Sequence, residues 1–181
     1  MDDDYASVTA DRAFDPIPVF CGWRFVQHGP LSRVIHALKY DNKPWLGTAL
    51  GRALAEAIRR QGFPLADVVV PIPLHRLKQL ERGYNQSEWI GRAVAERLRI
   101  DVTTSLLRRT TPTQTQTRLS RTDRWSNVKD AFETTEQLDG ASVLIIDDVV
   151  TTGATAYAAA LTLREAGCAA VRAAAVAFSS S

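Results

Sequence analysis

Two adjacent carboxylates, Asp147 and Asp148, follow four apolar residues and precede a turn of small and hydroxyl residues, 151–155. Side chains at the carboxyl end of a buried strand face the ligand in open α/β sheets. Carboxylates placed there accept hydrogen bonds from sugar hydroxyls and can share a Mg²⁺ ion with a nearby phosphate. The pair therefore predicts the ribose and metal side of a binding site.

The turn after the carboxylates has the composition of a phosphate cradle. Small residues let backbone N–H groups approach an anion closely, and a helix that begins at the turn favours negative charge. Together with the carboxylates, the turn predicts a site for a phosphorylated ribose. The alternative is a capped strand–helix turn with surface acids. The turn consists of Thr151, Thr152, Gly153, Ala154 and Thr155.

A second group of candidate residues is basic and follows the short apolar run 67–73. Positively charged and imidazole N–H donors suit the charge that develops on a phosphate leaving group. Each base taken alone is more typical of a solvated surface. The group as a whole predicts a second anion site, made by His75, Arg76, Lys78 and Arg82.

These patterns resemble the 5-phosphoribosyl-1-diphosphate (PRPP) motif of type I phosphoribosyltransferases. The runs Pro71-Ile72-Pro73 and 82–86 (RGYNQ), with Gln116, Leu119-Ser120 and Arg124 further on, are similar to the signature of the competence protein F (ComF) family. The resemblance covers about residues 29–178. The zinc ribbon common in that family needs four cysteines, whereas only Cys21 precedes the core in this sequence.

The resemblance implies a role for each group of residues. Asp147 and Asp148 would hold the ribose hydroxyls and Mg²⁺ and, with Arg76, would serve catalysis. The turn 151–155 would bind the 5-phosphate, and His75, Arg76 and Arg82 would bind the diphosphate. Gln116 and Arg124 would bind substrate from a flexible hood within the Thr-, Gln- and Arg-rich stretch 108–127. Thr151 replaces the acid that serves as a base in hypoxanthine/guanine-type members, which disfavours that substrate.

Two functions follow as expectations. The first is an enzyme that transfers the phosphoribosyl group of PRPP to an unidentified nitrogen acceptor, releases diphosphate and is linked to natural competence and DNA uptake. The second is a non-catalytic competence or regulatory protein that senses PRPP and contacts single-stranded DNA or a helicase partner. A homodimer is left open in either case.

The elements that must position these residues are readable from hydrophobic periodicity. Helical spacing predicts helices over 29–40, 44–60, 85–99 and 153–167, and buried apolar runs predict strands over 67–73, 142–147 and 169–178. Strand, helix and strand in succession predict a parallel sheet flanked by helices, and the resemblance implies the type I phosphoribosyltransferase fold. Residues 1–19 are expected to form a mobile acidic arm before one domain over 20–181.

Composition limits the classes of protein that fit. The 181 residues carry a net charge of +2, and 45% of them are hydrophobic, which suits one folded domain. No apolar stretch is long enough to span a membrane, the acidic N-terminus is unlike a signal peptide, and two cysteines suit a reducing cytoplasm. Residues 21–130 carry a net charge of +10 between acidic flanks, which suits a polyanionic partner, although solvated helix faces would explain it equally.

Overall fold

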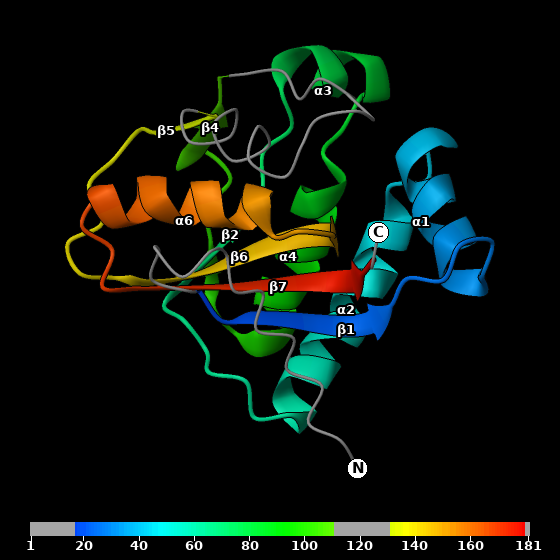
Figure 1. The fold of residues 1–181 in the computed structure, drawn as a ribbon, viewed down its shortest axis with the longest axis horizontal. Coiled ribbons are helices and arrows are strands. Elements are labelled where there is room, and N and C mark those ends of the chain that lie inside the picture. Colours follow the sequence, from blue (N-terminus) through cyan, green and yellow to red (C-terminus); the bar gives the residue numbers. More distant parts are fainter. Residues whose placement is uncertain (1–16, 111–130, 180–181) are drawn as a thin grey trace.

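The computed structural model describes residues 17–110 and 131–179. Helices cover both faces of a central sheet (Figure 1). In chain order the elements are β1 (Val19–Arg24), α1 (Pro30–Tyr40), α2 (Trp45–Arg60), β2 (Val68–Pro71), α3 (Arg76–Arg82), α4 (Gln86–Leu98), β3 (Asp101–Val102), β4 (Leu107–Arg109), β5 (Phe132–Thr134), β6 (Ser142–Val150), α6 (Ala154–Glu165) and β7 (Ala170–Phe178).

The central sheet has five strands in the order β1-β7-β6-β2-β3, and neighbouring strands pair in parallel. From β2 the chain continues to β3, toward one edge of the sheet. From β6 it continues to β7, toward the opposite edge. The order therefore reverses between β2 and β6, and open α/β sheets bind ligands beyond the carboxyl ends of the strands at this point. The predicted parallel α/β architecture is confirmed.

Alternating side chains of β6 supply two separate cores. Val143 and Ile145 pack on the side that α6 covers, whereas Leu144 and Ile146 pack with α2 and α4 on the other. Because both faces are covered, the strand reads as a continuous apolar run rather than an alternating one. Close packing also sets the position of α4, since a Cβ at Gly91 would lie 2.8 Å from Cγ of Pro71.

A small second sheet borders the ligand edge. β4 and β5 pair antiparallel, with Leu107 opposite Thr134 and Arg109 opposite Phe132. These two strands flank residues 111–130. The predicted hood residues Gln116 and Arg124 therefore lie outside the described residues, as do Leu119 and Ser120.

The predicted helices and the three predicted strands, β2, β6 and β7, are confirmed with shifts of a few residues at their ends. The strand predicted over 142–147 continues to Val150, because residues beyond the acids still pair with β7. The short elements β1, α3, β3, β4 and β5 had no clear periodic signal. Ile17 and Val19 are buried in the core, so the folded part includes the end of the range 1–19 that was expected to be an arm; residues 1–16 lie outside the described residues. No helix in the described ranges is long and apolar enough to cross a membrane.

Candidate functional site

The two carboxylates lie where β6 leaves the core. Asp148 is only 4% exposed, and its Oδ1 accepts a hydrogen bond from the Val149 N–H at 2.8 Å. Oδ1 of Asp147 accepts from the Asp148 N–H at 2.8 Å and from Ser87 Oγ at 2.9 Å. Both side chains are therefore held by hydrogen bonds within the protein, without a ligand.

The environment of Asp147 opposes its negative charge. Burial, and then the charge of Asp148, raise the pKa of Asp147 to about 7. The backbone N–H of Asp148, Lys39 and Ser87 act in the opposite direction without cancelling the shift. A ligand that brings hydroxyl donors or a cation would stabilise the ionised form.

Asp148 forms an ion pair with Lys39. Nζ of Lys39, near the end of α1, lies 2.6 Å from Asp148 Oδ2, and apart from this ion pair that oxygen has no hydrogen-bond partner in the described part of the chain. Burial acts to lower the pKa of Lys39, but the charges of Asp148 and Asp147 outweigh it and raise that pKa above its usual value. Lys39 therefore stays charged and fixes one of the two carboxylates.

The turn that follows β6 has the geometry of a helix start. Gly153 adopts φ +77°, a left-handed conformation that glycine takes without strain, and α6 begins at the next residue. Thr152 Oγ1 accepts a hydrogen bond from the Ala154 N–H at 3.4 Å. Thr151 is exposed, and Thr155 lines the cavity that contains the carboxylates.

The basic residues after β2 divide into two groups. His75, Lys78 and Arg82 line the same cavity as Asp147 and Asp148. Nδ1 of His75 accepts the Leu77 N–H at 3.3 Å, which leaves its Nε2 to carry the proton and to donate to a ligand. Arg76 is exposed and is not among the residues that line the cavity.

The run 82–86 (RGYNQ) connects the walls of the site. The Tyr84 hydroxyl donates to the Leu38 carbonyl of α1, and Asn85 Nδ2 donates to the Ile72 carbonyl just beyond β2 at 2.9 Å. Asn85 Oδ1 also accepts the Ser87 N–H at 3.1 Å and caps α4. The run thereby ties α1 and β2 to the helix that carries Ser87.

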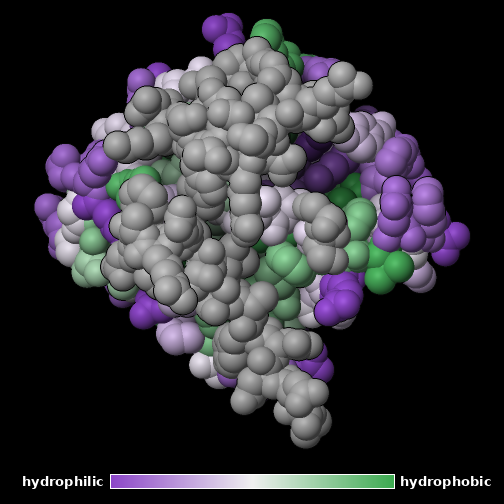
Figure 2. Space-filling view, viewed as in Figure 1, coloured by the Kyte–Doolittle hydropathy of each residue, from purple (hydrophilic) through white to green (hydrophobic). Residues whose placement is uncertain are grey.

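These elements enclose a cavity of about 300 Å³. It brings carboxylates from β6 together with donors from α1, α3 and β4, and its volume suits a small polar ligand. A hollow with hydrophilic walls is visible beside the lobe formed by α1 (Figure 2). The residues that line the cavity are Lys39, Tyr40, Ile72, Leu74, His75, Lys78, Arg82, Gln86, Arg109, Asp147, Asp148 and Thr155.

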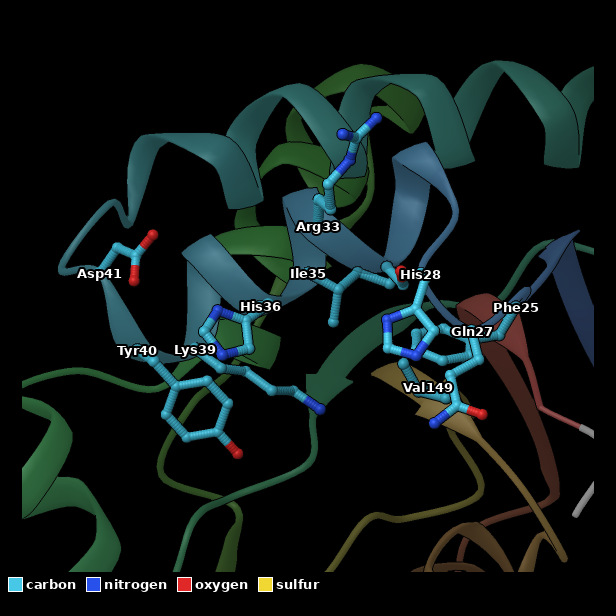
Figure 3. Close-up of a pocket in the computed structure, with 11 residues that line it drawn as sticks. Phe25, Gln27, His28, Arg33, Ile35, His36, Lys39, Tyr40, Asp41 and Val149 are labelled. Carbon is cyan, nitrogen blue, oxygen red and sulfur yellow. The ribbon is translucent and has the colours of Figure 1, made fainter.

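A second cavity of about 570 Å³ adjoins the first, because Lys39 and Tyr40 line both. Figure 3 shows Lys39 extending between the rings of His36 and Tyr40 on one side and His28 and Gln27 on the other. Ile35 and Val149 add apolar surface. The two cavities together are suited to two ligands that meet near Lys39.

Most of the residues predicted from sequence meet at the first cavity. Asp147, Asp148, Thr155, His75 and Arg82 line it, and 151–154 form the turn beside it. Lys39, Tyr40 and Arg109 were missed. For Arg109 a weak signal existed, since it follows buried Leu107 at the two-residue spacing of a strand and so occupies a core-facing position. For Lys39 the sequence carried none.

Comparison with known proteins agrees with this geometry. Residues 49–181 match the family described as the phosphoribosyl transferase domain. Competence protein F of Haemophilus influenzae is 32% identical over 145 residues, which are 76% of this chain and 63% of that protein. DNA utilization protein YhgH of Escherichia coli K12 is 36% identical over 147 residues, which are 79% of this chain and 65% of that protein. The chain therefore spans less than two thirds of the length of either relative.

Solved structures share the fold. Glutamine PRPP amidotransferase from B. subtilis superposes with a TM-score of 0.52 at 19% identity, over 77% of this chain and 30% of that one. This likeness, together with the parallel sheet, confirms the type I phosphoribosyltransferase fold that the resemblance implied. The chain belongs to the phosphoribosyl transferase domain family, and its sequence is similar to that of competence protein F.

Proposed function

We propose that this protein binds PRPP and transfers its phosphoribosyl group to a nitrogen acceptor with release of diphosphate. The observation that carries the proposal is the cavity, which joins two carboxylates and a phosphate-type turn to a wall of basic side chains. Each part of the cavity matches one part of PRPP. The carboxylates suit the ribose hydroxyls, the turn 151–155 suits the 5-phosphate, and His75, Lys78 and Arg82 suit the diphosphate.

In this reaction the side chains of the cavity act chiefly by electrostatic stabilisation and by orienting the substrate. The acceptor nitrogen forms a bond to C1 of the ribose and loses a proton to water, while the C1–O bond breaks and its electron pair remains on diphosphate. Donors fixed along the diphosphate stabilise the charge that develops there. Asp147 and Asp148 orient the ribose, so that C1 is presented with the leaving group toward the basic wall.

A magnesium ion fits this donor set only in part. Asp147 and Asp148 are hard oxygen ligands, but the described residues contain no group of three side chains able to hold a metal by themselves. Mg²⁺ typically keeps several waters and takes one or two carboxylates together with substrate phosphates. We therefore expect Asp147 and Asp148 to hold Mg²⁺ that arrives with PRPP. The bound ion would offset the charge of the diphosphate.

The adjoining cavity suits the acceptor. It contacts the first cavity at Lys39 and Tyr40, and its polar side chains Gln27 and His28 make no hydrogen bond with other described residues. Such groups can pair with a ligand. Assays with a panel of nitrogen nucleophiles would identify the acceptor that enters this cavity.

Calorimetry with PRPP and MgCl₂ tests the proposal. Wild-type protein should bind PRPP, and Asp147→Asn should weaken binding about 10- to 100-fold because a charged acceptor of the ribose hydroxyls is lost. Asp101→Asn is the matched control, since Asp101 is an exposed carboxylate at the start of β3. Diphosphate release with any acceptor of the panel supports transfer. Failure of the wild type to bind PRPP at millimolar concentration contradicts the proposal.

A second candidate function is a PRPP sensor that acts in DNA handling without catalysis. The names of the two relatives, a competence protein and a DNA utilization protein, favour it. PRPP binding without turnover across the panel would support this function over the first. Direct DNA contact predicts binding of a labelled single-stranded oligonucleotide that weakens steeply from 50 to 200 mM salt, and absence of binding at low salt contradicts such contact.

A further inference from the structure

Arg109 is a cavity-lining cation with no carboxylate partner among the described residues. Its Nε is buried and has no hydrogen bond, and its guanidinium forms no ion pair with the described residues. Two other long cations of the cavity wall do have partners, since Lys39 pairs with Asp148 and Arg82 donates to Gln86. Of the two arginines that line this cavity, Arg109 is the one whose side chain makes no hydrogen bond or ion pair with a described residue.

The strand fixes the direction of this side chain. In β4 the side chains alternate, so Leu107 is buried, Arg108 is exposed and Arg109 turns inward again. The Arg109 guanidinium carbon lies 5.3 Å from the centroid of the Phe132 ring on the paired strand, which supports the cation from one side. The remaining donors therefore face the cavity rather than the small sheet.

An unpaired, partly desolvated charge is costly to keep. Burial lowers the pKa of Arg109, and the charge of Asp147 opposes that shift only in part. In folded proteins such a cation is usually paired, because removal from water is offset only by hydrogen bonds and counter-charge. The missing partner in this cavity is an anion, and a guanidinium offers the planar pair of donors that phosphate oxygens match.

We propose that Arg109, rather than Arg76, is the arginine that joins Arg82 in binding the diphosphate group in this cavity. This inference rests on the proposed function and adds a residue to it. As the C1–O bond breaks, its electron pair passes to a diphosphate oxygen, and Arg109 stabilises that charge by hydrogen bonds while it keeps its own proton. Arg76 is exposed outside the cavity, so it serves no such contact.

The experiment measures binding of inorganic diphosphate with MgCl₂ by calorimetry, together with thermal unfolding, on the full chain. Arg109→Met keeps an apolar stem against Phe132 and removes the charge, Arg109→Lys keeps the charge without the fork, and Arg108→Met is the control on the exposed face of the same strand. We expect Arg109→Met to weaken binding about 10- to 100-fold, Arg109→Lys to lie between, and Arg108→Met to match wild type.

Thermal unfolding separates ligand binding from a structural role. Removal of an unpaired buried charge should leave the melting temperature unchanged or raise it, whereas removal of a structural contact should lower it. The inference is overturned if Arg109→Met binds diphosphate like wild type, if binding and melting temperature fall together, or if Arg76→Met weakens binding more than Arg109→Met. If wild type binds neither diphosphate nor PRPP, the proposed function fails and the inference fails with it.

Discussion

Lys39 and Arg109 line the same cavity from two different elements of the fold, and only Lys39 has a carboxylate partner among the described residues. Lys39, on α1, lies 2.6 Å from Asp148 Oδ2, whereas Arg109, on β4, has no ion pair with described residues. Nearby carboxylates raise the pKa of Lys39 despite burial, and burial lowers the pKa of Arg109. The comparison indicates that Lys39 holds the carboxylate of Asp148, whereas Arg109 is the cation that we propose to bind a ligand.

The two largest expected effects concern stability, and one of them lies on the Lys39 side of the site. Lys39→Met should lower the free energy of unfolding by about 3 kcal/mol, because it leaves the buried carboxylate of Asp148 without a counter-charge. Urea denaturation measures the change. The double variant Lys39→Met/Asp148→Asn should recover most of it. Arg52→Met, which breaks an exposed pair with Glu96 at 3.6 Å, should cost less than about 1 kcal/mol. If the double variant is no more stable than Lys39→Met, the ion pair is not the cause.

A pH effect of similar size is expected at Asp147, the carboxylate next to this ion pair. Its pKa is about 7 in the folded protein and about 4 in the unfolded chain. Between these values the folded state keeps a proton that the unfolded state has lost, so stability is full below pH 4 and falls by about 4 kcal/mol as pH rises through 7.

Urea denaturation at pH 5 and pH 8 measures this effect. Asp147→Asn lacks the titrating group, so the loss of stability between the two pH values should be smaller in this variant than in wild type. Equal losses in the two proteins would show that Asp147 titrates normally.

The affinities for PRPP and for inorganic diphosphate should distinguish the roles of Lys39 and Arg109. Lys39→Met should weaken PRPP binding about tenfold, because Asp148 loses its orientation, but should change inorganic diphosphate affinity by about threefold at most. Arg109→Met should weaken both. Calorimetry with each ligand in MgCl₂ provides the four values. If Lys39→Met and Arg109→Met lose affinity for both ligands to the same extent, the two cations do not differ in their roles.

The smallest expected effect concerns Ser87, which donates to Asp147 Oδ1 at 2.9 Å and is fully buried. Ser87→Ala should cost about 1 kcal/mol of stability, and more at pH 8 than at pH 5, because the ionised carboxylate uses the hydroxyl most. Ser32→Ala is the control, since Ser32 donates to the neutral Gly29 carbonyl at 2.8 Å. A loss that is independent of pH would assign Ser87 to packing alone.

Local patterns were sufficient for much of the fold. The helices α1, α2, α4 and α6 and the strands β2, β6 and β7 follow from periodicity, since each buries its own apolar side chains. The short strands β4 and β5 could not be predicted in the same way. A strand of three residues is too short for a periodic pattern to predict it. The pairing of β4 with β5 across 22 intervening residues (110–131) depends on the rest of the structure.

The ligand edge of the sheet could be predicted from the sequence alone. Asp147, Asp148 and the turn 151–155 are contiguous, so the strand and helix on either side place them together in any βαβ unit. The RGYNQ run 82–86 was recognised as a signature, but its contacts to the Leu38 and Ile72 carbonyls, which explain its place in the site, became visible only in the structure.

Which cations line the cavity became visible only in the folded protein. Arg76 and Arg109 are both arginines beside apolar residues, yet Arg76 is exposed and Arg109 lines the cavity. Lys39 meets Asp148 from 109 residues away in the chain. Charge acts through space and depends on desolvation, so its role is set by burial and by neighbours that the folded chain alone brings together.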